Sequence, residues 1–276
     1  MKLSLSAIST LNASFAEDVR AYAAAGFDAI GLWEMKLPDD DDANRALLRE
    51  HGLGVANCVP AVPSFLQLGI PGLEGPAAPE ERTQAICASI ERLATYEPES
   101  VLVLSGPLGS LSLEGARRVV LDGLRRAAAV ARDAGVRLGL EPIHPAQRES
   151  TAFVCSLADA LALLDEAGLD EVGIMADTFN LAREGTPEVV AAMGRFTGLH
   201  VADVPPEEVP GLRVLPGEGG GRSAELVAAL RKAGWDGTLD VEIFSTPEAF
   251  WSLPAGEAAR RAHTAVAALA SAGSTV

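Results

Sequence analysis

Four side chains able to bind a metal ion each follow an apolar stretch in the second half of the chain. They are Glu141 in LGLEPIHP, Asp177 in IMADTFN, His200 in GLHVAD and Glu242 in LDVEIFS, hereafter the quartet. Each residue alone has an ordinary structural explanation, such as a salt bridge, a helix N-cap or a packed histidine. Brought together, three buried carboxylates would repel one another unless a cation lay between them. Three oxygen donors and one nitrogen donor suit a single divalent ion, for which we expect Mn²⁺, with Mg²⁺, Co²⁺ or Zn²⁺ as alternatives.

Assembling the quartet requires a fold that gathers strand ends, and the sequence repeats a unit of that kind. Eight β-rich runs alternate with amphipathic stretches rich in Ala, Leu and Arg. The predicted strands are 3–8, 29–33, 54–59, 101–106, 137–143, 172–177, 198–203 and 239–244. The predicted helices cover 15–25, 43–51, 80–95, 112–134, 156–167, 187–194, 223–233 and 256–271.

This alternation predicts an α/β protein with a parallel sheet. Eight units in 276 residues favour a closed (β/α)8 TIM barrel, with residues 1–276 as a single domain. The carboxyl ends of the strands form the mouth of such a barrel, which would bring the quartet together. An open Rossmann sheet is disfavoured because STLNAS at 9–14, after the first predicted strand, lacks the glycine-rich phosphate turn.

The composition is acidic and otherwise ordinary for a globular protein. With 22 basic and 38 acidic residues the formal net charge is −16, so we expect no nucleic-acid partner. The apolar runs are far shorter than the roughly 18 residues of a membrane span, and MKLSLSAISTLN is a poor secretory signal, so we expect no membrane partner. The three cysteines, Cys58, Cys87 and Cys155, lack the number and spacing of a disulfide framework or a zinc knuckle. These features predict a cytoplasmic protein with reduced thiols.

Several segments carry a family resemblance: the quartet itself, EPIHP at 141–145, VEIFS at 241–245, and RVLPGEG, which contains Arg213. On these segments the chain resembles the xylose-isomerase-like TIM-barrel superfamily of sugar isomerases and epimerases, over essentially its full length and most specifically over 136–244. The quartet falls where that family places its single catalytic divalent metal, and Arg213 matches the loop with which ketose epimerases contact substrate. Ketose 3-epimerases commonly read Asp-x-x-His after the sixth strand, whereas this chain has DTFN, with Asn180 at the histidine position. Asparagine keeps hydrogen bonding without a titratable group, so the substrate need not be a free ketohexose.

The resemblance implies a metal-dependent isomerase or epimerase that acts on a sugar or a sugar-like ketone. Proton abstraction α to a carbonyl needs a base at the carbon, and a divalent ion stabilises the enediolate that forms. We expect Glu141 and Glu242 to act as the acid/base pair as well as ligands, as in the family's epimerases. The same arrangement would serve β-elimination. A lyase or dehydratase, resembling inosose dehydratase or acting on an oxidised sugar or glycoside, is therefore the alternative function.

Five further residues are candidates for substrate binding, namely Arg213, His144, Asn180, Asp203 and Glu34. The fixed donors of Arg213 suit hydroxyls or an anionic group, with a surface ion pair as the alternative. His144 could reach the substrate or cap a loop. Asp203 could orient His200, bind a hydroxyl or cap a helix. Glu34, beside Trp33 at the end of the second predicted strand, could form a sugar-facing wall.

Two other classes of protein fit the sequence less well. A DNA-repair endonuclease of the related trinuclear-zinc barrels would need more than the four histidines present, and a basic groove that the net charge of −16 opposes. A non-catalytic barrel would have an incomplete ligand set, whereas all four positions are filled here. We expect a small-molecule carbohydrate as the substrate. A homo-oligomer is also possible, because family members are often dimers or tetramers and the apolar segment SFLQLGI at 64–70 could form an interface or a lid.

Overall fold

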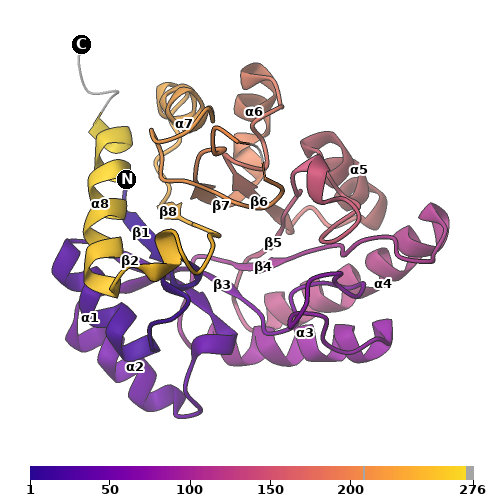
Figure 1. The fold of residues 1–276 in the computed structure, drawn as a ribbon. Helices are drawn as coiled ribbons and strands as arrows, with labels where there is room; N and C mark the ends of the chain where they lie inside the picture. The colour runs from indigo at the N-terminus through magenta and orange to yellow at the C-terminus, as the bar shows by residue number, and fades with distance from the viewer. Residues whose placement is uncertain (208, 272–276) are drawn as a thin grey trace.

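The strands of the chain close into a barrel (Figure 1). The computed structural model describes residues 1–207 and 209–271. The strands found there are β1 (Leu3–Ser6), β2 (Ala29–Trp33), β3 (Gly54–Val59), β4 (Val101–Val103), β5 (Leu138–Leu140), β6 (Gly173–Asp177), β7 (Phe196–Val201) and β8 (Leu239–Val241). Each strand pairs in parallel with the next, and β8 returns to β1 with Asp240 opposite Ser4, so the sheet has no edge. The predicted (β/α)8 barrel is confirmed.

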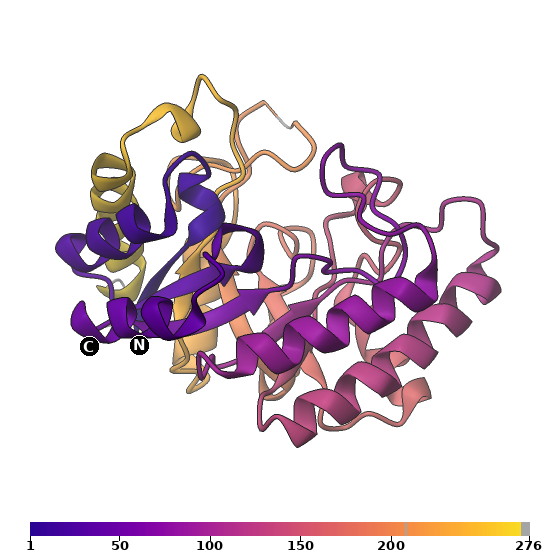
Figure 2. The ribbon, with the colours of Figure 1, turned by 90° about the horizontal axis from the view of Figure 1, so that it is seen from below.

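The α-helices pack around the outside of the sheet (Figures 1 and 2). They are α1 (Phe15–Ala25), α2 (Asp41–Glu50), α3 (Pro79–Ala94), α4 (Leu113–Asp133), α5 (Leu157–Ala167), α6 (Thr186–Ala192), α7 (Ser223–Lys232) and α8 (Ala255–Ser271). The end signals of α1 are typical: Ser14 and Glu17 form a capping box, and Gly26 ends the helix in the left-handed region at φ 96°. The first and last helices, α1 and α8, pack on each other and complete the ring.

Several strands are shorter than the sequence predicts, because burial continues after strand pairing has ended. The fifth strand stops at Leu140, although Ile143 is also buried. The Ile143 N–H donates to the carbonyl of Val154, in the same βα loop, instead of to a neighbouring strand. Residues Ala7–Thr10 likewise form a buried 3₁₀ helix where the sequence predicts the end of the first strand. Hydrophobicity alone therefore overestimates strand length at the mouth of the barrel.

Long loops follow β3, β7 and β8 and rise on one side of the barrel (Figure 2). Together with the strand ends they enclose a cavity of about 600 Å³. This volume is typical of a small-molecule site, and the carboxyl ends of the strands are where barrel enzymes place such sites. Among the described residues, no helix has the length and apolar character needed to cross a membrane.

Candidate metal centre

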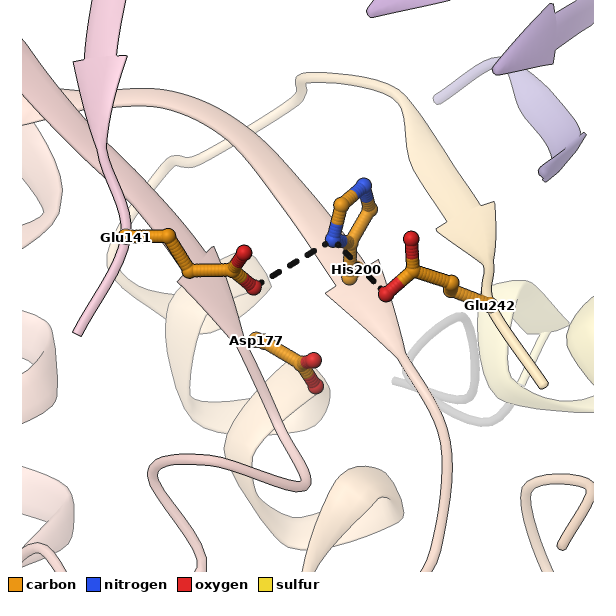
Figure 3. Close-up of side chains that lie close together, drawn as sticks. All are labelled: Glu141, Asp177, His200 and Glu242. Carbon is orange, nitrogen blue, oxygen red and sulfur yellow. Dashed lines mark ion pairs between the residues drawn. The ribbon is translucent and has the colours of Figure 1, made fainter. Parts of the chain in front are cut away.

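The quartet comes together at the carboxyl ends of β5 to β8. Each residue offers one ligand atom, and these atoms all lie within 4.8 Å of one another. All four side chains are buried. His200 lies between the two glutamates, with its Nδ1 3.5 Å from Glu141 Oε1 and 3.4 Å from Glu242 Oε2 (Figure 3). The structure thus gathers three carboxylates and one imidazole into a single cluster.

Backbone pairing with neighbouring strands holds each member of the quartet in place. Asp177 and His200 are register partners across β6 and β7. Glu141 and Glu242 directly follow their strands, yet their N–H groups still bond to the preceding strand of the barrel. The Glu141 N–H donates to Val103 at 3.0 Å, and the Glu242 N–H donates to the last residue of β7 at 3.4 Å. The side chains therefore project from rigid elements, which favours a preorganised site.

Burial and the neighbouring charges set the protonation of the cluster. Burial raises the pKa of Glu141 to about 7, against the opposing effect of His200. Burial also raises the pKa of Asp177, and Arg213 opposes this shift. For His200, burial lowers the pKa, but Glu242, Glu141 and a further carboxylate outweigh it and raise the pKa to about 10. A protonated imidazole and the Arg213 guanidinium thus balance the buried carboxylates.

The donor atoms of the quartet fit a divalent cation. Both ring nitrogens of His200 are buried without a hydrogen-bond partner, and a buried polar atom left in this condition is costly. Its Nδ1 nevertheless faces carboxylate oxygens on two sides. Oxygen-rich sites with one imidazole match the preferences of Mn²⁺, Mg²⁺, Co²⁺ and Zn²⁺. The quartet is therefore the set of residues that could hold such an ion.

Asp240 is a buried residue of the site that the sequence analysis did not identify. Its Oδ2 lies 3.6 Å from Nε2 of His200, on the opposite side of the ring from the quartet, and accepts a hydrogen bond from the Asn57 amide at 2.6 Å. Burial raises the pKa of Asp240 to about 6, while His200 lowers it. The sequence contains one signal of this position, because Asp240 stands two residues before Glu242 and so faces the same way along the strand. The structure adds that Gly31 of β2 leaves room for it, since a Cβ there would meet Asp240 Oδ2 at 2.3 Å.

Asn180 connects two members of the quartet. Its amide nitrogen donates to Glu141 Oε1 at 3.1 Å and to Asp177 Oδ2 at 3.3 Å. Its amide oxygen accepts a hydrogen bond from the His144 backbone N–H at 3.0 Å. The side chain is buried. Asn180 therefore lies beside the cluster and orients two of its carboxylates.

Arg213 is buried in the site, not at the surface. Its Nη1 lies 2.8 Å from Asp177 Oδ2 and 2.5 Å from Glu242 Oε2. The guanidinium is sandwiched between Phe179 and Phe244, 5.0 Å from each ring centroid. Burial lowers the pKa of Arg213, but Asp177 and Glu242 reverse this effect and raise it. Arg213 thus contacts the quartet directly and also lines the cavity.

The remaining residues identified in the sequence lie outside the quartet. The His144 Nδ1 accepts a hydrogen bond from the Ala146 N–H at 3.3 Å, at the start of a short 3₁₀ helix. The Asp203 carboxylate accepts hydrogen bonds from Gly217 and Ser223, which places it at the start of α7 and against the preceding loop. Glu34 is held by the Ala61 N–H at 2.8 Å and by Arg92 at 3.4 Å. The structure does not bring Glu34 to the quartet or to the wall of the cavity.

The cavity opens directly onto the cluster. Glu141, Glu242 and Arg213 form part of its wall. The opposite walls come from the loops after β1, β2 and β3, together with Phe244 and Trp251. A small molecule entering the mouth of the barrel can therefore reach two of the quartet's carboxylates and the guanidinium.

Comparison with known proteins gives the family of this chain. Among solved structures, a protein from Sinorhizobium meliloti 1021 has a TM-score of 0.84 at 23% identity, covering 96% of this chain and 97% of the other. The IOLI protein, solved with a binding zinc atom, has a TM-score of 0.81 at 22% identity and covers both chains fully, 100% of each. The 3-keto-D-glucoside 4-epimerase of E. coli has a TM-score of 0.73 at 21% identity, covering 98% and 99%. No curated protein sequence matches the chain.

At these identities the structural likeness establishes the fold alone. The family comparison reaches further, because residues 19–269 match the family described as Xylose isomerase-like TIM barrel. That match spans more than half of the chain and confirms the resemblance seen in the sequence. The chain belongs to the xylose isomerase-like TIM-barrel family.

Proposed function

We propose that this protein is a divalent-metal-dependent isomerase or epimerase that moves a proton α to the carbonyl of a sugar or sugar-like ketone. The observation that carries the proposal is the convergence of four buried donor atoms within 4.8 Å at a cavity in the barrel mouth. The family and two of the similar structures support it, since one is solved with zinc and another is a keto-glucoside epimerase. We propose Mn²⁺ as the natural ion because the donor set is rich in carboxylates.

Glu141 and Glu242 are the proposed acid/base pair. They approach His200 from opposite sides (Figure 3), and both line the cavity. A substrate held between them would present opposite faces of its α-carbon to the two carboxylates, so one can remove the proton and the other can return it.

The other residues of the site position these groups. A bound divalent ion would supply Lewis-acid stabilisation of the negative charge that develops on the carbonyl oxygen. Asn180 orients Glu141 and Asp177 through its amide. Arg213 holds Glu242 and lines the cavity, where its guanidinium can donate to a substrate oxygen.

Exchange of the α-proton with D₂O tests this function. Metal-loaded and chelator-treated protein would be incubated with a panel of ketoses and 3-keto-glucosides and followed by proton NMR. We expect loss of an α-proton signal only with metal, and no exchange with Glu141→Gln. Metal-dependent release of water or of the aglycone, without exchange into recovered substrate, would support the lyase instead. Exchange that is equally fast in chelator-treated protein would contradict a metal-dependent reaction.

A further inference from the structure

The cavity above the quartet has two chemically different parts. Its floor carries the charged groups Glu141, Glu242 and Arg213. The wall formed by the loops after β1, β2, β3 and β8 is apolar, and is hereafter called the apolar wall. It consists of Ile8, Trp33, Leu68, Ile70, Phe244 and Trp251, among other apolar residues.

The aromatic rings of the apolar wall offer no free donor to a sugar hydroxyl. The Trp33 Nε1–H donates to Ser6 Oγ at 3.0 Å, and the Trp251 Nε1–H donates to the Ile8 carbonyl at 2.8 Å. Phe244 stands between the two indoles, with ring centroids 5.7 Å from Trp33 and 6.5 Å from Trp251. Only carbon faces and edges therefore point into this part of the cavity. A hydroxyl placed there would lose its water without gaining a partner, which is unfavourable.

The apolar wall is fastened to the barrel and is therefore a built surface. The loop that contributes Leu68 and Ile70 is tied to α3 by Arg82, whose side chain is fully buried. The Arg82 guanidinium donates to the Ser64 carbonyl at 2.7 Å, to the Glu74 carbonyl at 2.5 Å and to the Pro76 carbonyl at 2.8 Å. These bonds hold both ends of the loop, so its apolar side chains face the cavity before any ligand enters.

Polar groups suited to hydroxyls also line the cavity. Besides the charged floor, these are Gln147, Ser150 and Thr151 from the loop after β5. A ligand with hydroxyls at one end only would match the division between the charged floor and the apolar wall. The volume of about 600 Å³ corresponds to about twenty waters at roughly 30 Å³ each, whereas a free hexose has only about twelve non-hydrogen atoms.

We infer that the substrate is a sugar-like ketone that carries an apolar substituent of ring size, such as an aromatic aglycone. The inference rests on the proposed function for the polar end, which binds at the floor beside the quartet. The apolar substituent packs against Trp33, Phe244 and Ile70. The apolar wall thus selects a substituted sugar over a free ketose, because burying the ring is favourable and burying hydroxyls there is not.

Methyl β-D-glucopyranoside and phenyl β-D-glucopyranoside test the inference, since they differ only in the substituent. Their affinities would be measured by isothermal titration calorimetry with chelator-treated and Mn²⁺-loaded protein. We expect the phenyl glucoside to bind at least tenfold more tightly in both preparations. Ile70→Asn should reduce this preference at least fivefold and leave binding of the methyl glucoside unchanged. Leu111→Asn, at an exposed leucine outside the cavity wall, is the matched control and should keep the full preference.

The inference would be overturned if wild-type protein preferred the phenyl over the methyl glucoside by less than threefold. It would also be overturned if Leu111→Asn lost as much of this preference as Ile70→Asn. Binding of neither glucoside would also overturn it. If Ile70→Asn does not fold, as judged by circular dichroism, Leu73→Asn on the same loop replaces it. Metal binding is measured separately by thermal shift. A phenyl preference without metal binding therefore refutes the proposed function alone, and metal binding without the preference refutes the inference alone.

Discussion

The substitution Asp240→Asn isolates the carboxylate behind His200. Asp240 Oδ2 lies 3.6 Å from His200 Nε2, while Nδ1 of the same ring faces the quartet. A histidine that ligates through Nδ1 is best oriented when a carboxylate accepts the proton on Nε2. The amide oxygen introduced by the substitution could still accept the hydrogen bond from Asn57, but the new side chain carries no charge. The change therefore removes the charge and leaves the packing nearly intact.

The size of the effect follows from the geometry. Replacing a group that orients a metal-binding histidine typically costs about 10- to 100-fold in metal affinity. Because the 3.6 Å separation is too long for a hydrogen bond, we expect the lower end, about a tenfold loss. A tenfold loss of affinity corresponds to about 1.4 kcal/mol.

The assay is competition between the protein and a fluorescent chelator for Mn²⁺ or Zn²⁺ at fixed pH. Asp28→Asn is the matched control: Asp28 also accepts a hydrogen bond through its carboxylate, from the Leu3 N–H at 2.9 Å, but lies at the opposite end of the barrel. We expect the control to bind metal as wild type does. Affinity within twofold of wild type in Asp240→Asn, or an equal loss in Asp28→Asn, would refute the assigned role of Asp240.

Three further predictions concern the same site. Glu141→Gln and Glu242→Gln should remain inactive in excess Mn²⁺, whereas His200→Ala should regain part of the wild-type activity under the same conditions. A Gln variant with wild-type turnover would exclude that residue as acid or base. Metal binding at pH 8 should release about one proton, because the pKa of His200 is raised to about 10 and a histidine ligand must be neutral. The apparent metal affinity should therefore rise with pH between 7 and 10. Calorimetry in buffers of different ionisation enthalpy measures the proton release, and finding none would contradict this prediction. Arg213→Ala should lower the free energy of unfolding of chelator-treated protein by about 3–5 kcal/mol, because two buried carboxylates lose their partner. Added metal should restore part of this loss. An unchanged midpoint of urea unfolding would show that Arg213 does not stabilise the cluster.

The sequence predicts the barrel and the quartet because both depend on local patterns. Each member of the quartet follows its own apolar run, and a parallel barrel places the ends of such runs at one mouth. The strand ends are less predictable. Ile143 is as hydrophobic as a strand residue, but its N–H bonds within a loop, so apolar character does not show where pairing stops.

The partners of the quartet depend on contacts between distant segments, which a single sequence does not show. In the segment LDVEIF, Asp240 looks like an ordinary polar strand residue. Only the structure shows that Gly31, on another strand, leaves room for its carboxylate. The loop motif around Arg213 indicates substrate contact, with a surface ion pair as the alternative. The structure instead buries Arg213 between Phe179 and Phe244, against two carboxylates. Burial of this kind comes from tertiary packing.

Calorimetric titration of chelator-treated protein with Mn²⁺ tests the central claim most directly, namely that the quartet holds one divalent ion. We expect a stoichiometry of one ion per chain for wild type, and no measurable binding after Asp177→Ala combined with His200→Ala. The double variant must first be shown to be folded by circular dichroism. A wild-type chain that binds neither Mn²⁺ nor Mg²⁺, Co²⁺ or Zn²⁺, or a folded double variant that binds Mn²⁺ as tightly as wild type, would contradict the account.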